Sequence, residues 1–504
     1  MNQSPVRPRL LLWACFAALT ATSFGFIIRA LIMDEWATQF MLSETQKGEI
    51  LGVGLWPFAI SIVLFSLVID HIGYGRAMVF AFVCHVTSAI ITIFAPRHFD
   101  PYWSLWLGNF TVALANGTVE AVINPVVATM FPREKTKWLN ILHAGWPGGF
   151  VLGGLLTLGM GDRFGWEWKV GLLLLPTLAY GLMMLGHKFP IHERVAAGVS
   201  YKSMLQEAGT LGCLIVVALI VRELGRVFAW TLPVQLVIGA VLVVGYGAYV
   251  RALGRPLFIL LVLVMIPLAT TELGVDSWVT SLMAPEMASL GIRAGWILVY
   301  TAFIMNVLRF CAGPIIHRLS PLGLLAICSA VAAVGLVWLS TSTGVAILLA
   351  ATAYGIGKTF FWPTTLGIVA ERFPKGGALT LNTISGVGML GVGIIGTVLL
   401  GNIQDKEIDH GLADSNPALH AQVVGDEKRS VFGAYRPVDE ARLKALPAEE
   451  QASVVAIQAA AKKSALKTVT IFPLVMFVCY VALIIYFRAT GGYKQVELTA
   501  GAPS

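Results

Sequence analysis

Long apolar segments separated by short polar stretches dominate the chain, and we count fourteen of them. They run for roughly 18 to 28 residues, the length that a helix needs to cross a hydrocarbon layer about 30 Å thick. The segments lack the alternation of a β-strand, and a bilayer interior admits only helices and closed barrels. The pattern therefore predicts an all-α polytopic membrane protein with about 14 transmembrane helices.

The segments fall into three groups along the chain. Six lie in residues 1–186, two more follow a polar stretch in the linker 187–255, and six lie in residues 256–504. The first apolar run, residues 10–33, is longer than the core of a signal peptide, so we expect it to be retained as the first helix.

Two parts of this layout are less regular. The first inserted segment carries Arg222, Glu223 and Arg226, which leaves open whether it crosses the whole bilayer. The long stretch 404–465 is charged in both signs and is helix-prone near residues 447–463. We expect a solvated surface loop there, and the alternative is a lid or a partner-binding segment.

An internal repeat relates the first and last groups. Residues 131–140 and 373–382 each begin with Phe-Pro and end with Leu-Asn, at an offset of 242 residues. In both copies a long segment enters a short basic turn and a glycine-rich segment leaves it. Two six-helix halves in parallel repeat are an architecture of secondary transporters, which bind solute between the halves. The glycines at 145, 149 and 153 predict close helix packing.

Composition and charge place the chain in its membrane. Only 12% of the residues are charged and 57% are hydrophobic, whereas a soluble protein carries about 25% charged residues. If the N-terminus is cytoplasmic, the cytoplasmic ends of the segments hold sixteen Lys and Arg residues, and the short outer loops hold seven. Basic residues concentrate in cytoplasmic loops. We therefore expect a multi-pass protein of the inner (cytoplasmic) membrane with both termini cytoplasmic.

Several kinds of chemistry have no signal in the sequence. The six cysteines and nine histidines are scattered at unrelated spacings, so we predict no metal site and no cofactor. No basic patch with interleaved aromatic residues predicts nucleic-acid binding. No phosphate loop or nucleophile–base arrangement predicts an enzyme. We expect a monomer whose partners are the lipid bilayer, a small-molecule substrate and H+.

The fourth segment carries the polar pattern that best predicts a site. Asn116, Glu120 and Asn124 recur at every fourth residue and share one helix face. A charge at mid-bilayer costs roughly 2.5–3.5 kcal/mol, so Glu120 needs a function; we expect it to gain and lose a proton, the alternative being a static hydrogen-bonded acid. The repeat aligns Lys358 with Asn116 and Trp362 with Glu120. We expect this cation and indole to face a cavity, where they suit a sugar ring or an anion.

Other polar residues inside or beside apolar segments complete the set. The further candidates for substrate binding are Glu272, Asp276, Arg29, Asn306, Arg309, His143 and Trp146. Helix packing is the alternative for the last two. The candidates for gating lie in the turns after the second segment of each half and are Asp70, Gly73, Arg76 and Arg318. The apolar segments hold three cations and three carboxylates, namely Arg29, Arg309 and Lys358 against Glu120, Glu272 and Asp276. A purely structural salt-bridge network would show the same balance.

The turn after the second segment resembles the signature of the major facilitator superfamily, a Gly followed by Asp-Arg/Lys-x-Gly and basic residues. This chain keeps Asp70, Gly73 and Arg76, with Ser66 for the leading Gly and His71 for the first basic residue. The resemblance covers nearly the whole chain except the inserted pair and the long loop, and it implies the major facilitator fold.

Within that superfamily, Glu120-x-x-x-Asn124-Pro125 and the later Leu-Asn pair are similar to the fucose/galactose/glucose:proton symporters. That similarity implies proton coupling at Glu120. Those permeases also use an Asp in the first helix, where this chain reads Phe26 to Ala30 with no acid.

These observations predict a secondary active transporter that moves a small polar solute, a sugar, by alternating access in symport with protons. An organic-anion (carboxylate) transporter of the same superfamily is the alternative, because Arg29, Arg309 and Lys358 could attract an anion. A non-transporting membrane sensor or enzyme on the same scaffold is the third possibility.

Overall fold

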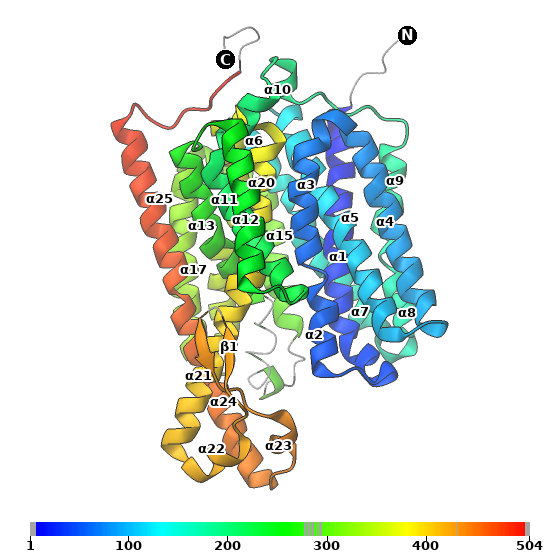
Figure 1. The fold of residues 1–504 in the computed structure, drawn as a ribbon, viewed down its shortest axis with the longest axis vertical. Helices are drawn as coiled ribbons and strands as arrows, with labels where there is room; N and C mark the ends of the chain where they lie inside the picture. The colour runs from blue at the N-terminus through cyan, green and yellow to red at the C-terminus, as the bar shows by residue number, and fades with distance from the viewer. Residues whose placement is uncertain are drawn as a thin grey trace.

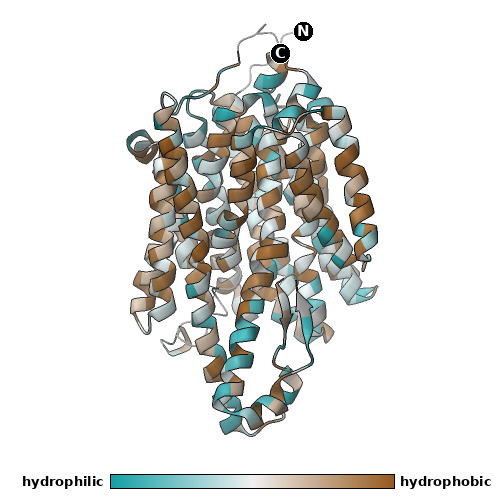
Figure 2. Cartoon of the chain, turned by 60° about the vertical axis from the view of Figure 1, so that its left-hand side comes forward, coloured by the Kyte–Doolittle hydropathy of each residue, from teal (hydrophilic) through white to brown (hydrophobic). Residues whose placement is uncertain are grey.

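The structure is a bundle of long helices that run side by side (Figure 1). It is a computed structural model, and it describes residues 7–276, 279, 283, 287–289, 291, 295–430 and 432–498. Within these residues, eleven helices are long and apolar enough to cross a membrane. A twelfth span is α15 (Gly295–Phe310) with α16 (Ala312–Leu319), which are bent by 68°. Figure 2 shows hydrophobic residues along these helices.

The first group of apolar segments forms one set of helices. Its elements are α1 (Pro8–Phe40), α2 (Glu44–Gly52), α3 (Trp56–Ile72), α4 (Tyr74–Phe94), η1 (Ala95–Arg97), α5 (Pro101–Met130), α6 (Lys135–His143), α7 (Gly145–Met160), η2 (Gly161–Arg163), α8 (Trp166–Gly171) and α9 (Leu174–Met184). The linker adds α10 (Glu193–Ala196), α11 (Tyr201–Val227) and α12 (Leu232–Val250). Most of α12 is exposed at the side of the bundle.

The later group forms a second set of helices. Its elements are α13 (Pro256–Ala269), the π-helical turn η3 (Thr270–Gly274), α15, α16, α17 (Pro321–Thr341), α18 (Ala346–Lys358), α19 (Phe361–Arg372), η4 (Pro374–Gly376), α20 (Gly377–Gly391), the π-helical turn η5 (Val392–Gly396), α21 (Thr397–Ser415), α24 (Ala448–Val469) and α25 (Ile471–Ala489). We call the end at which α1 begins and α25 ends the termini end (Figure 1).

The prediction of an all-α polytopic membrane protein is confirmed, and each of the fourteen predicted segments contains helix. Twelve of them are the spans described above. The other two are interrupted, one between α8 and α9 and one between α18 and α19. The second interruption falls at Thr359 and Phe360, shortly before Pro363, whose ring cannot continue a regular helix from the preceding turn.

The long polar stretch between the last two spans folds into a small domain of its own. Between α21 and α24 lie α22 (Pro417–Val423), a hairpin of β1 (Lys428–Ser430) and β2 (Gly433–Tyr435), and α23 (Glu440–Lys444). The domain also includes the end of α21 and the start of α24. Its apolar core consists of Ile408, Leu412, Leu419, Val423, Val424, Leu443, Val454 and Ala461. This domain projects from the end opposite the termini end (Figure 1). The stretch expected to be helical near 447–463 lies in α24.

Glycines in several helices allow neighbouring helices to pack closely. A Cβ atom on Gly117 of α5 would lie 2.2 Å from the carbonyl oxygen of Phe58 in α3. A Cβ atom on Gly149 of α7 would lie 1.8 Å from the Ser23 Oγ atom of α1. The glycine repeat of α7 therefore permits the close approach that the sequence predicts. The first and second sets of helices meet where α3 and α5 pack on α20, α6 on α19, and α7 on α15.

Candidate functional site

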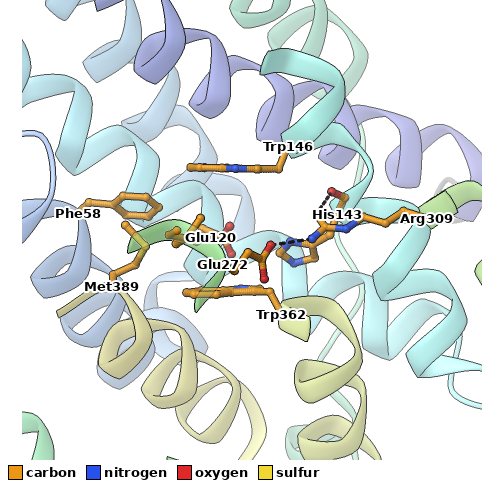
Figure 3. A pocket seen from close by; sticks show the side chains of 9 residues that line it. Phe58, Glu120, His143, Trp146, Glu272, Arg309, Trp362 and Met389 are labelled. Carbon is orange, nitrogen blue, oxygen red and sulfur yellow. Dashed lines mark hydrogen bonds and ion pairs between the residues drawn. The ribbon is translucent and has the colours of Figure 1, made fainter. Parts of the chain in front are cut away.

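A buried cavity lies where the two sets of helices meet (Figure 3). Its lining comes from α3, α5, α6, α7, η3, α15, α19 and α20, and consists of Phe58, Glu120, His143, Trp146, Glu272, Leu273, Arg309, Trp362 and Met389. Its volume is about 20 Å³, enough for about one water molecule. Both sets of helices therefore contribute to one small cavity that holds two carboxyls, an imidazole and a guanidinium among apolar side chains.

Two tryptophans from opposite sets face this cavity. Trp146 of α7 and Trp362 of α19 lie on opposite sides of it, and the carboxyl groups of Glu120 and Glu272 lie between the two indoles (Figure 3). Phe58 and Met389 close one side. An indole face packs well against the apolar face of a ring, and its N–H can donate a hydrogen bond. The cavity therefore offers two flat surfaces with acidic groups between them.

Arg309 is held in place by three acceptors. Its Nη2 atom lies 2.8 Å from Glu272 Oε1, its Nη1 atom donates to the His143 carbonyl at 2.8 Å, and its Nε atom donates to the Thr359 carbonyl at 2.7 Å. Both carbonyls lack their usual helical donor, because the residues four positions later, Pro147 and Pro363, have no N–H. The guanidinium supplies the missing donors, so it is fixed to both sets of helices.

The two carboxyl oxygens of Glu272 have different surroundings among the described residues. The residue lies in the π-helical turn η3, five residues after Pro267 inside α13, and such turns are frequent at functional sites. The Oε1 atom pairs with Arg309, whereas the buried Oε2 atom has no hydrogen-bond partner among the described residues. Because Glu272 lines the cavity, this oxygen can accept a hydrogen bond from a ligand.

Glu120 is the second acid of the cavity, and Arg309 lines the same cavity without contacting it as an ion-pair partner. Glu120 is 4% exposed and forms no ion pair with any residue that the structure describes. Its Oε2 atom accepts a hydrogen bond from Asn124 Nδ2 at 2.7 Å. The Asn124 Oδ1 atom in turn lies 2.8 Å from His143 Nε2, which donates to it. Asn124 therefore holds both the carboxyl and the imidazole of the cavity in place.

Lys358 and Asp276 form a second ion pair beside the cavity, in which Lys358 is fully buried and Asp276 is partly exposed. The Lys358 Nζ atom also lies 4.9 Å from the centre of the Tyr354 ring. Neither member of the pair lines the cavity itself. Lys358 was expected to face the cavity. It lies beside the cavity, and its ammonium group is paired with Asp276.

The remaining predicted binding residues make contacts elsewhere. Asn116 accepts from His85 at 2.9 Å inside the first set of helices. Arg29 donates to the Ser88 hydroxyl at 2.9 Å and has no carboxylate partner among the described residues. Asn306 of α15 donates at 2.8 Å to the carbonyl of Ala144, the residue between α6 and α7. The expected balance of three cations and three carboxylates thus resolves into two ion pairs, with Arg29 and Glu120 held separately.

The predicted gating residues lie at the termini end. Asp70 pairs with Arg194 of α10, in the linker between the two sets. Gly73 adopts a positive φ of 82°, which an L side chain rarely takes, and so lets the chain turn between α3 and α4. Arg76 and Arg318 are exposed.

A contact network that the sequence analysis did not identify joins the two sets at this end. The Thr136 hydroxyl donates to Glu371 at 2.5 Å, and Lys135 donates to the Ala370 carbonyl at 3.1 Å. The C-terminal tail adds a bond from the Tyr493 hydroxyl to Glu371 at 2.6 Å. The repeated basic turns mark where these contacts lie, but their pattern does not reveal the partners.

The fold and cavity described above define a polytopic membrane transporter. The sequence matches the family model of the Major Facilitator Superfamily over residues 10–401. The chain therefore belongs to the major facilitator superfamily, and the predicted fold is confirmed. No curated protein matches the sequence.

Solved transporters share this fold at low sequence identity. The Escherichia coli fucose:proton symporter FucP is 16% identical, with a TM-score of 0.53 over 92% of this chain and 98% of that chain. The proton:xylose symporter XylE is 12% identical, with a TM-score of 0.61 over 97% of each chain. The human organic anion transporter MFSD10 is 12% identical, with a TM-score of 0.59 over 95% of this chain and 100% of that chain.

Proposed function

We propose that this transporter moves a small hydroxylated ring compound, a sugar, together with a proton by alternating access. The observation that carries the proposal is Glu120, a carboxyl in no ion pair with a described residue, in a cavity to which both sets of helices contribute. A carboxyl with no cationic partner can be neutralised by a proton alone. Its position between Trp146 and Trp362 lets one group sense both the proton and the solute (Figure 3).

The lining of the cavity suits a sugar. The two indoles offer flat apolar surfaces to the C–H faces of a pyranose ring. The free Glu272 Oε2 atom and the Glu120 carboxyl offer acceptors to ring hydroxyls. The fold is shared with FucP and XylE, which are sugar:proton symporters.

The size of the cavity supports alternating access. A space of about 20 Å³ holds no sugar, since ligand pockets measure roughly 300–1,000 Å³. Binding therefore requires the two sets of helices to separate. The contacts of Thr136 and Lys135 with the second set close the termini end, so we propose that the described conformation opens from the opposite end.

An organic anion is the second candidate, supported by Arg309 in the cavity and by the fold shared with MFSD10. The charge arrangement favours it less. Arg309 and Lys358 each bind a carboxylate, and Arg29 binds Ser88 instead of lining the cavity. An anion would also meet the carboxyls of Glu120 and Glu272.

We further propose that the protein is a monomer of the inner membrane whose termini end faces the cytoplasm. The basic residues that the sequence analysis assigned to the cytoplasm support this orientation. They include Arg133, Lys135, Lys188, Arg194 and Lys375.

Uptake into proteoliposomes tests the proposal. Purified protein should accumulate a hexose or 6-deoxyhexose against its gradient when a proton gradient is imposed. Glu120→Gln should abolish uphill accumulation and keep downhill exchange, because an amide cannot carry the proton. Glu407→Gln, at an exposed carboxyl in α21, is the matched control and should behave as wild type.

Three outcomes would contradict parts of this reasoning. If Glu120→Gln still accumulates sugar with the wild-type proton dependence, Glu120 is not the proton carrier. If carboxylates exchange and no sugar does, the organic-anion candidate is correct. If neither Trp362→Ala nor Trp362→Phe changes the affinity for sugar, the Trp362 indole is not a binding surface.

A further inference from the structure

A groove on the lipid-facing side of the bundle lies between α4 and α9, which pack against each other at the edge of the first set (Figure 1). Its volume is about 550 Å³, within the range of roughly 300–1,000 Å³ typical of ligand pockets. The lining is almost entirely apolar and includes Val79, Phe82, Gly181, Leu182, Leu185 and Phe189.

The groove is a shaped feature of these two helices. A Cβ atom on Gly181 would lie 2.5 Å from the Phe82 ring, so the absence of a side chain there lets the ring lie back against α9. Val79, Leu182 and Leu185 are 64%, 71% and 75% exposed in the described chain. In a membrane these walls meet acyl chains. The groove is therefore an apolar recess on the outer side of the bundle, near the termini end.

The mouth of the groove carries uncommitted positive charge. Arg76 lies one helical turn before Val79 on the same face of α4. Phe189 lies over the start of α4, where a Cβ atom on Gly75 would be 3.5 Å from its ring, and this brings the neighbouring Lys188 to the same place. Arg76 and Lys188 are exposed, and neither makes a hydrogen bond or ion pair with a residue that the structure describes. The nearby carboxylate of Asp70 is occupied by Arg194.

We propose that this groove is a binding site for an anionic phospholipid. One acyl chain lies between α4 and α9, and the phosphate of the headgroup binds Arg76 and Lys188. Lysine and arginine beside the hydrocarbon boundary attract anionic lipids. The groove supplies the apolar half of the ligand's recognition and the two cations supply the charged half, so the site distinguishes an anionic lipid from a zwitterionic one. The inference is independent of the transported solute.

Native mass spectrometry of the purified full-length protein tests this site. The protein is titrated with phosphatidylglycerol or phosphatidylcholine of identical acyl chains. Wild type should retain one phosphatidylglycerol with about tenfold preference, since each basic residue near the surface adds attraction. Arg76→Gln/Lys188→Gln should reduce that preference to within about twofold.

Matched variants separate the two halves of the site. Arg9→Gln/Arg488→Gln removes the same charge from exposed residues elsewhere at the termini end and should keep the preference. Leu182→Trp fills the groove from an exposed position and should weaken binding of both lipids; Val79→Trp tests the opposite wall if the first variant folds poorly. Glycerol phosphate alone should not compete.

Equal retention of the two lipids by wild type would overturn the proposal. So would an equal loss of preference in the Arg9/Arg488 control, which would show a diffuse charge effect. Unchanged binding in a folded groove-filling variant would place the lipid elsewhere, and competition by glycerol phosphate would show a site for free phosphate.

Discussion

The ion pair between Arg309 and Glu272 should couple strongly in stability measurements. Arg309 is 1% exposed and Glu272 is 2% exposed, and their charged atoms lie 2.8 Å apart. Arg309→Met leaves a buried carboxylate without its cation, and removing one member of a buried pair costs about 3–5 kcal/mol. The change corresponds to a factor on the order of a hundred to several thousand in the unfolding equilibrium constant.

Removing both charges should cost less than the sum of the single changes. In Arg309→Met/Glu272→Gln no charge is left unpaired, and the remaining loss comes from the carbonyls of His143 and Thr359, which lose their donor. An unsatisfied buried group costs about 1–3 kcal/mol. We therefore expect the double variant to be more stable than Arg309→Met, with a coupling energy of about 2 kcal/mol or more.

Equilibrium unfolding in mixed detergent micelles, followed by tryptophan fluorescence, measures all four proteins of this cycle. The control cycle is Arg97→Met/Glu167→Gln, where the two side chains are 58% and 25% exposed. A pair this exposed should show a coupling of about 1 kcal/mol or less. Additive losses at Arg309 and Glu272, or a coupling no larger than that of the control, would refute the view that this pair is closed to solvent.

Two further changes address the termini end. Glu371→Gln replaces a carboxylate that accepts hydrogen bonds from Thr136 and Tyr493. Amide exchange in residues 135–143 should therefore rise several-fold in hydrogen–deuterium exchange mass spectrometry. Unchanged exchange would mean that this contact does not close the termini end. Burial lowers the pKa of His192 from 6.5 to about 4, with Arg194 and Lys135 acting in the same direction and Asp70 opposing them. The unfolded chain therefore binds a proton first, so stability falls as the pH drops from about 7 towards 4; His192→Gln should flatten the fall in melting temperature between pH 7.5 and 5, and an equal fall in both proteins would exclude His192 as its source.

The sequence was sufficient for the fold because hydropathy and repetition act along the chain. The repeated Phe-Pro pairs do mark equivalent positions: α5 ends at Met130, directly before the first pair, and α19 ends at Arg372, directly before the second. The sequence analysis did not predict the small domain after α21, because its apolar segments are short and scattered along the chain. Their core combines residues of α21, α22, α23 and α24, which lie far apart along the chain.

The site was predicted less completely, because helical spacing places residues on a face without saying what covers that face. Asn116, Glu120 and Asn124 share one face of α5, yet only Glu120 lines the cavity. His85 covers Asn116, and His143 covers Asn124. The apolar members of the lining, such as Phe58, look like any other core residue of a transmembrane segment.

Prolines explain why our proposal assigns the change of charge during transport to Glu120 and not to Arg309. Pro125 removes the helical donor for the Ala121 carbonyl, and Asn382 of the second set supplies one at 3.1 Å. Arg309 does the same for two other carbonyls, so its guanidinium is part of the packing between the helices. Moving it towards an arriving anion would leave three acceptors unsatisfied. Glu120 has one hydrogen bond to a side chain and no ion pair among the described residues, and a proton can change its charge without disturbing that packing.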